Sequence, residues 1–253
     1  MIDLHSHLLP GVDDGSRSVE QSVSVLARLA AVGVTDVCLT PHLTVASAGL
    51  GIPPAYDAAF NALRAAAPAT PRLHRGVELM LDRPFSRETA RSGVTLGGTR
   101  YVLVEFTRIV PAATVQSALK QVVECGLTPL LAHPERYSSC SPRAVSVWRE
   151  SGALMQVDAN TLLAGSARGD RARALLAAGL ADILAADNHG DGASQALARE
   201  VLEGQGAEAQ AELLTVTNPR AILENRAVTA VEPVTLSPSL TWRLRRFLNG
   251  GER

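Results

Sequence analysis

The sequence predicts an α/β protein on a parallel sheet, most simply a closed or nearly closed barrel. Short apolar, β-branched runs alternate about seven times with helical stretches rich in Ala, Leu and Arg. Helix ends meet strand starts in the recurring segments AVGVTDV, ECGLTPL and AAGLADI, and 253 residues suit one such barrel. A doubly wound open sheet is the alternative, but no G-x-G-x-x-G follows the first strand.

The expected elements follow one another along the chain with short connections. Strands are expected at residues 1–7, 34–40, 73–79, 101–106, 128–133, 154–160 and 182–188. Helices are expected near 18–32, 55–67, 112–125, 142–151, 168–178 and 192–204. We expect a single domain, with a barrel over 1–225 and a C-terminal extension over 226–253. The end of that extension, TWRLRRFLNGGER, reads as a short basic amphipathic helix or as a solvated terminus.

Composition narrows the class of protein. Hydrophobic residues make up 46% of the chain, enough for a sizeable core, and its apolar runs are too short for a membrane span. A net charge of −1 gives no electrostatic reason to expect nucleic acid as a partner. The first residues lack the basic and then apolar pattern of a signal peptide, which predicts a cytoplasmic protein. Three cysteines without C-x-x-C spacing predict reduced thiols rather than disulfides.

Polar residues gather where the predicted strands end, the place where barrels of this class carry function. Five of the six histidines lie there, and the pairs His5/His7 and Asp187/His189 each share one strand face. Nine nitrogen and oxygen donors are expected to converge: His5, His7, Asp14, His42, Glu78, Glu105, His133, Asp187 and His189. Histidine and carboxylate without thiolate suit Zn, Mn or Fe, and nine ligands exceed the needs of one ion. The sequence therefore predicts a cluster of two or three metals.

The motifs H-x-H, D-D-G, T-P-H, G-x-E, V-E-F, A-H-x-E-R-Y and D-x-H, in this order, resemble the PHP (polymerase and histidinol phosphatase) superfamily. Within it, MIDLHSHLLPGVDDGSRS, LAHPERY and TNPRAIL resemble the bacterial protein-tyrosine phosphatases of capsule and exopolysaccharide operons. The resemblance implies a distorted, TIM-like (β/α)7 barrel with three divalent metal ions, typically manganese, with iron or zinc as other possibilities. It implies one metal on His5, His7, Glu78 and Asp187, a second on Glu78, Glu105 and His133, and a third on Asp14, His42 and His189. It also implies that Arg136 contacts the substrate phosphate.

Two segments depart from the family pattern where substrate would approach. The loop after His42 reads LTVASAGLGIPP, which is apolar and rich in glycine, where the family usually carries basic or polar residues. The segment after His189 reads GDGASQ and lacks the arginine that the family often has there. Arg108, Arg168 and Arg17 are the candidates to replace it.

These observations predict a metal-dependent phosphomonoester hydrolase. We expect in-line attack by a metal-bridging hydroxide on a phosphoryl group held by metals and Arg136, with Asp14, Glu105 or His189 protonating the leaving oxygen. A bacterial tyrosine kinase of capsule or exopolysaccharide synthesis is the expected substrate. A small-molecule phosphatase of the histidinol-phosphatase type and a catalytically weak metal-binding regulator remain alternatives. A cysteine mechanism is disfavoured, because none of the cysteines begins a C-x5-R motif.

Overall fold

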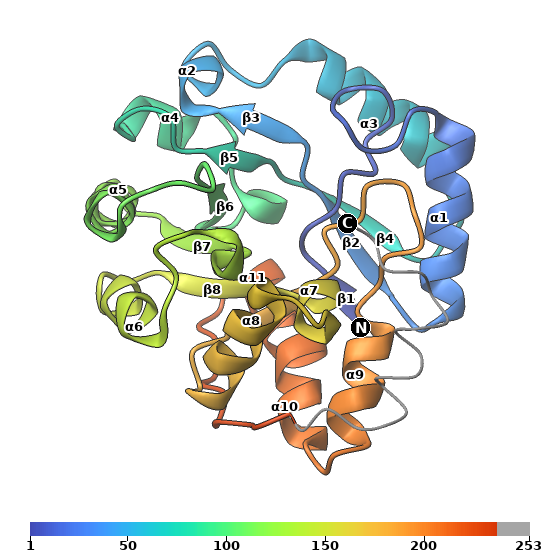
Figure 1. Cartoon of the computed structure of the whole chain (residues 1–253). Coiled ribbons are helices and arrows are strands. Elements are labelled where there is room, and N and C mark those ends of the chain that lie inside the picture. The colour runs from blue at the N-terminus through green and yellow to red at the C-terminus, as the bar shows by residue number, and fades with distance from the viewer. Residues whose placement is uncertain (237–253) are drawn as a thin grey trace.

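Two parallel β-sheets form the centre of the molecule, and helices cover them on the outside (Figure 1). The computed structural model describes residues 1–236. The predicted basic helix in TWRLRRFLNGGER lies outside these residues. Within 1–236, no helix combines the length and the apolar character needed to cross a membrane.

All strand pairs are parallel, as predicted, but the strands divide between two sheets. The smaller sheet has the order β1-β2-β4 and the larger one the order β3-β5-β6-β7-β8-β9. The strands are β1 (Ile2–Asp3), β2 (Asp36–Leu39), β3 (His42–Thr44), β4 (Arg72–Arg75), β5 (Glu78–Met80), β6 (Tyr101–Glu105), β7 (Thr128–Ala132), β8 (Leu154–Asp158) and β9 (Ile183–Ala185).

The strand expected over 73–79 is two strands, and the residues around Gly76 separate them. A Cβ at Gly76 would lie 2.8 Å from the end of the Leu96 side chain, so a larger residue would push that side chain aside where the chain passes from β4 to β5. The first strand is also shorter than expected. Asp3 Oδ1 accepts the N–H groups of His5 and Ala186, at 3.2 Å each, and so replaces the strand ladder there.

Backbone hydrogen bonds connect the two sheets at both junctions. On one side, the N–H of His7 donates to the carbonyl of Asn188 at 2.7 Å, and that of Asp187 donates to His5 at 3.1 Å. On the other side, the N–H of Glu78 donates to the carbonyl of Pro41 at 3.0 Å. The start and the end of the strand series therefore lie side by side, as expected for strands one and seven.

The helices follow the predicted order, with several short additions. They are α1 (Val19–Ala31), α2 (Val45–Ala48), α3 (Pro54–Ala66), α4 (Arg87–Arg91), α5 (Ala112–Glu124), α6 (Pro142–Glu150), α7 (Ala159–Leu163), α8 (Ala167–Ala177), α9 (Ala196–Glu203), α10 (Glu208–Glu212) and α11 (Asn218–Leu223). Ser18 is the N-cap of α1, since its side chain accepts the N–H of Gln21 at 3.2 Å. Gly33 follows that helix with φ of 87°, as its sequence position predicts.

Alternating side chains of the strands pack on opposite faces. In β6, Val102 and Val104 join the large cluster beneath the helices, whereas Leu103 joins a second cluster with Leu130 and Ile183. This second cluster also contains Ile2 of the smaller sheet, so both sheets enclose it. Glu105, two residues beyond Leu103, therefore emerges on the enclosed side at the end of its strand.

Candidate metal centre

One pocket of about 240 Å³ opens at the C-terminal ends of the strands. It is lined by Asp14, His42, Glu78, Glu105, Phe106, Arg108, His133, Arg136, Tyr137, Asp187 and His189. Seven of the nine predicted ligands and all four predicted catalytic residues (Arg136, Asp14, Glu105 and His189) are in this lining. The other two ligands, His5 and His7, are fully buried beside Glu78 and Asp187.

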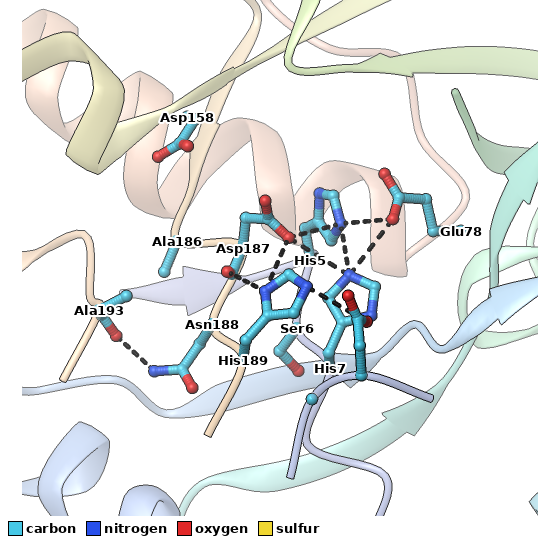
Figure 2. Close-up of polar contacts among 12 residues, drawn as sticks. His5, Ser6, His7, Glu78, Asp158, Ala186, Asp187, Asn188, His189 and Ala193 are labelled. Carbon is cyan, nitrogen blue, oxygen red and sulfur yellow. Dashed lines mark hydrogen bonds and ion pairs between the residues drawn. The ribbon is translucent and has the colours of Figure 1, made fainter. Parts of the chain in front are cut away.

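Four buried donor atoms meet in the floor of the site (Figure 2). The Nε2 atoms of His5 and His7 lie 3.2 Å apart. Each also lies 3.2 Å from Glu78 Oε2, and they lie 3.2 and 3.3 Å from Asp187 Oδ1. Metal–ligand bonds of about 2.0–2.2 Å place neighbouring ligand atoms about 3.0–3.4 Å apart. The floor therefore has the spacing of a first coordination shell.

Hydrogen bonds orient both histidine rings toward this point. His7 Nδ1 lies 2.8 Å from the carboxylate oxygen Oδ2 of Asp13, which accepts its proton. His5 Nδ1 lies 2.9 Å from Gln156 Oε1, and the same oxygen accepts the backbone N–H of His133 at 3.3 Å. Since a backbone N–H only donates, that Gln156 atom is the oxygen and His5 Nδ1 carries the proton. When both rings are neutral, Nε2 of His5 and Nε2 of His7 each carry a lone pair, and both atoms face Glu78 Oε2 and Asp187 Oδ1.

Unsatisfied buried atoms indicate that a cation fits there. Glu78 Oε2, Asp187 Oδ1 and His133 Nδ1 are buried and form no hydrogen bond with any residue of 1–236. Polar atoms buried in this way cost folding free energy unless they gain a partner. A divalent ion on Glu78 Oε2 and Asp187 Oδ1 supplies that partner, and the nitrogen and oxygen donor set suits Mn, Fe or Zn.

The outer part of the site is half-exposed. His42 Nδ1 lies 3.0 Å from Glu78 Oε2 and 3.1 Å from Glu105 Oε1. Asp14 Oδ1 lies 3.5 Å from His42 Nε2 and 3.6 Å from His189 Nε2. Because His189 Nδ1 donates to the carbonyl of Asp187 at 2.9 Å, its Nε2 faces Asp14 unprotonated when the ring is neutral.

The nine ligand residues fall into four overlapping groups. Within each group the donor atoms lie within 4.8 Å of one another. The groups are His7/Asp14/His42/His189, His5/His7/Asp187, His5/Glu78/His133 and His42/Glu78/Glu105. Glu78 is the one carboxylate that belongs to two of these groups, and His5, His7 and His42 also belong to two each.

Strained backbone marks two of the ligands. His133 and Asp187 have φ of 34° and 49°, and they are two of the three non-glycine residues of 1–236 with positive φ. Side chains seldom adopt this region unless the surroundings impose it, and such residues cluster at functional sites. The turn aims His133 Nε2 at Glu78 Oε1, 2.8 Å away.

The glycine of D-D-G has a packing role. A Cβ at Gly15 would lie 2.0 Å from the backbone oxygen of His7, which no side chain can accommodate. The Gly15 N–H also donates to Asp13 Oδ1 at 3.0 Å. This close approach lets Asp13 reach the ring of His7 and also accept the N–H of His42 at 3.2 Å.

Negative charge at the site raises the proton affinity of its histidines. Burial alone lowers the pKa of His5, but Glu78 and Asp187 outweigh it and raise the pKa to about 9. Burial likewise opposes charge on His42, and Glu105 and Glu78 raise its pKa to about 10. The ligand set therefore attracts positive charge, which metal ions and protons compete to supply.

Arg136 lies at the pocket wall between two carboxylates. Its Nη2 is 2.5 Å from Asp158 Oδ2 and 2.5 Å from Asp187 Oδ2. Burial lowers the pKa of Arg136, but Asp187 and Asp158 outweigh it and raise the pKa further above its already high value. Arg136 thus fixes the outer oxygen of Asp187 while its inner oxygen faces His5 and His7.

Sequence reasoning missed the contacts that orient the ligands. Gln156 was not singled out, although it is a polar residue inside the apolar run LMQVD and shares a strand face with Asp158. That alternation is the one signal that could have found it. No sequence pattern predicts the pairing of Asp158 with Arg136, because 22 residues separate the two.

The cysteines lie outside this chemistry. Burial, followed by the charge of Glu135, raises the pKa of Cys140 to about 12. Burial raises the pKa of Cys38 strongly as well. Neither thiol lines the pocket, in agreement with the absence of a C-x5-R motif.

Comparison with known proteins shows the family to which this chain belongs. Residues 1–224 match the sequence model of the family described as "Capsular polysaccharide synthesis, CpsB/CapC". The chain belongs to the CpsB/CapC family. The relationship covers every residue assigned to the site.

Individual members of the CpsB/CapC family are distant in sequence. The tyrosine-protein phosphatase CpsB of Streptococcus pneumoniae is 26% identical over 246 residues, which cover 90% of this chain and 100% of that protein. The tyrosine-protein phosphatase YwqE of Bacillus subtilis is 26% identical over 175 residues, or 64% of this chain and 66% of that protein. A crystal structure reported for YwqE and CpsB as metal-dependent tyrosine phosphatases matches with a TM-score of 0.77 at 24% identity. It covers 94% of this chain and 99% of that one, which establishes the shared α/β fold.

Proposed function

We propose that this protein is a divalent-metal-dependent protein-tyrosine phosphatase. The observation that carries the proposal is the convergence of nine nitrogen and oxygen donors, seven in the lining of one pocket and two buried beside it, in a pocket that also contains two arginines. Metal ions and guanidinium groups are the usual partners of a phosphoryl group during its transfer. The names of the relatives from Streptococcus pneumoniae and Bacillus subtilis support the same activity.

The proposed cofactor is a set of three divalent manganese ions. His5, His7, Glu78 and Asp187 would hold the first, Glu78, Glu105 and His133 the second, and Asp14, His42 and His189 the third. Such ions, when bound, neutralise phosphoryl oxygens and lower the pKa of coordinated water from 15.7 to about 7. The fit rests on the close spacing of the donor atoms and on the unsatisfied oxygens of Glu78 and Asp187.

Residues at the pocket wall supply positioning and proton transfer in this proposal. Arg136 would orient the phosphoryl group with the N–H groups that its ion pairs with Asp158 and Asp187 leave free. Asp14, Glu105 and His189 face the pocket and are the candidates to deliver a proton to the leaving oxygen. A tyrosyl leaving group, with a pKa near 10, needs less of this assistance than an alkoxide.

The proposed substrate is a phosphorylated bacterial tyrosine kinase of capsule or exopolysaccharide synthesis, and the family description, which names capsular polysaccharide synthesis, supports that setting. We also propose a cytoplasmic location. The two sheets would form one distorted (β/α)7 barrel over 1–225, closed by the hydrogen bonds between residues 5–7 and 187–188. Residues 226–236 would extend the same domain, and the rest of the expected extension, 237–253, lies outside the described residues.

Hydrolysis rates on three substrates test the proposal. The protein is stripped with a chelator, reloaded with Mn²⁺, and assayed on p-nitrophenyl phosphate, a phosphotyrosyl peptide and histidinol phosphate. We expect activity only after reloading, and faster hydrolysis of the peptide than of histidinol phosphate. Comparable rates on the last two substrates would contradict a specific tyrosine phosphatase, and no activity on any of them would leave a metal-binding regulator.

A further inference from the structure

The two arginines of the pocket differ in how their charge is balanced. Arg136 pairs with both Asp158 and Asp187, so two carboxylates offset its single charge. The guanidinium of Arg108 forms no hydrogen bond or ion pair with any residue of the described range 1–236, although it lines the same pocket. Arg108 therefore presents uncompensated positive charge to whatever enters.

Hydrogen bonds fix the loop of Arg108 against the segment that carries Arg136. The backbone oxygen of Arg108 accepts the N–H of Ser138 at 2.8 Å, and the N–H of Phe106 donates to the hydroxyl oxygen of Tyr137 at 3.2 Å. The Tyr137 hydroxyl itself is held by donating to the carbonyl of Ala132 at 2.9 Å. The backbone of Arg108 is thus held at the pocket wall by its own hydrogen bond to Ser138 and by the buried contacts of Phe106 and Tyr137 beside it.

A second unpaired guanidinium lies near Arg108. Arg168 stands in the first turn of α8, and Arg171 ties that turn down by donating its Nε–H to the carbonyl of Glu135 at 2.7 Å. Partial burial lowers the pKa of Arg168, and the charges of Arg108, Arg136 and Arg171 lower it further. Arg168 has no hydrogen bond or ion pair within the part of the chain that the structure describes. An anion bound at Arg108 would therefore also be attracted by the charge of Arg168.

We infer that Arg108, with the charge of Arg168 beside it, binds the phosphoryl oxygens of the substrate as the uncompensated cation of this pocket. The planar fork of a guanidinium donates two parallel hydrogen bonds to a phosphate, and Arg108 breaks no ion pair in doing so. Arg136 would have to share its N–H groups with two carboxylates. The segment after His189, GDGASQ, contributes no cation of its own. This inference rests on the proposed phosphatase function.

The test measures binding and turnover separately. Phenylphosphonate, an aryl phosphate analogue that cannot be hydrolysed, is titrated calorimetrically into Mn²⁺-loaded wild type and into Arg108→Ala, Arg108→Lys, Arg168→Ala and Arg143→Ala. Arg143 is the matched control, since it is an exposed arginine of α6 that does not line the pocket. Metal content is measured for each variant, and KM and kcat are determined on p-nitrophenyl phosphate.

We expect Arg108→Ala to weaken phenylphosphonate binding about tenfold and to raise KM similarly, the size typical of a charge-assisted hydrogen bond at a partly exposed site. Arg108→Lys should recover part of the loss, Arg168→Ala should lose less than Arg108→Ala, and Arg143→Ala should match wild type. All variants should hold the same amount of metal. Equal binding by Arg108→Ala and Arg143→Ala would overturn the inference even in an active enzyme. If phenylphosphonate binding depended on Arg108 but no variant and no wild-type protein hydrolysed p-nitrophenyl phosphate, the anion site would stand. The proposed phosphatase function would then be overturned instead.

Discussion

Gln156 contacts two of the predicted metal ligands, His5 and His133, through a single oxygen atom. Its Oε1 lies 2.9 Å from His5 Nδ1 and 3.3 Å from the backbone nitrogen of His133, two residues far from it in the sequence. The contact fixes the tautomer of His5 and thereby directs its Nε2 at Glu78 and Asp187. Orienting contacts of this kind commonly contribute 10- to 100-fold to metal affinity, about the size expected here.

Replacing Gln156 therefore tests whether its contact with His5 orients the His5 ring for metal binding. We expect Gln156→Leu to fold but to bind Mn²⁺ about 10- to 100-fold more weakly, because the His5 ring loses its acceptor. Gln156→Glu keeps an acceptor in the same place and should remain within a few fold of wild type. Calorimetric titration with Mn²⁺ measures both. Equal affinities for wild type and Gln156→Leu would show that the contact does not orient the ligand.

Glu78 should matter more than any other ligand, since it faces His5, His7, His42 and His133. Glu78→Gln removes the negative charge that two of the four ligand groups share. We expect metal content to fall to background and the increase in melting temperature on adding Mn²⁺ to disappear, because binding to the native state is what raises that temperature. Glu88→Gln, a change in the first turn of α4, is the control and should behave like wild type. A Mn²⁺-dependent shift that persists in Glu78→Gln would contradict the ligand assignment.

Arg136 should affect turnover more than metal binding. It contacts the outer oxygen of Asp187, while the inner oxygen faces the histidines. We expect Arg136→Ala to retain metal by elemental analysis and to lose about 10²- to 10³-fold in kcat on p-nitrophenyl phosphate, the usual cost of removing a donor to developing negative charge. If Arg136→Ala lost its metal instead, the residue would be a support for Asp187 and would have no demonstrated part in catalysis.

The strand ends were predictable because their signal is local. Buried apolar runs such as YVLVE and TPLLA identify β6 and β7, and the polar residue that follows each run falls at the pocket. Parallel strands bring such residues together whatever their separation in sequence. This argument placed Glu105 and His133 at the site without any knowledge of their partners.

The division into two sheets and the orienting contacts were not predictable in the same way. The residues around Gly76 separate β4 from β5, and the Leu96 side chain that lies beside Gly76 comes from 20 residues further along the chain. The contact between His5 and Gln156 spans 151 residues, and the face on which a strand side chain lies does not specify its partner. Periodicity therefore locates the site, whereas three-dimensional packing decides how each ligand is held.

The ionisation of Asp36 should make the free energy of unfolding depend on pH, independently of the metal site. Burial alone would raise its pKa, but hydrogen bonds from Arg72, His74 and Thr35 outweigh it and hold the pKa below the ordinary value of 3.8. A carboxyl group with a lowered native pKa stabilises the fold above its unfolded pKa, and that contribution is lost as pH falls through the native pKa. We expect Asp36→Asn to lower the free energy of unfolding by about 1 kcal/mol at pH 7.

Urea unfolding of wild type and Asp36→Asn at pH 7 and near pH 3 measures this effect. The difference between the two proteins should shrink at the lower pH, because there the Asp36 carboxyl of the unfolded wild-type chain takes up a proton that the native state still excludes. A difference that stays constant between the two pH values would assign the stability change to packing rather than to the charge of Asp36.

The release of inorganic phosphate from a phosphotyrosyl peptide, measured before chelation, after chelation and after Mn²⁺ is restored, tests the central claim most directly. The nine ligands around one pocket predict phosphate release that disappears with chelation and returns with Mn²⁺. Glu78→Gln should release none under any of the three conditions. Phosphate release that continues unchanged after complete removal of metal would contradict the account.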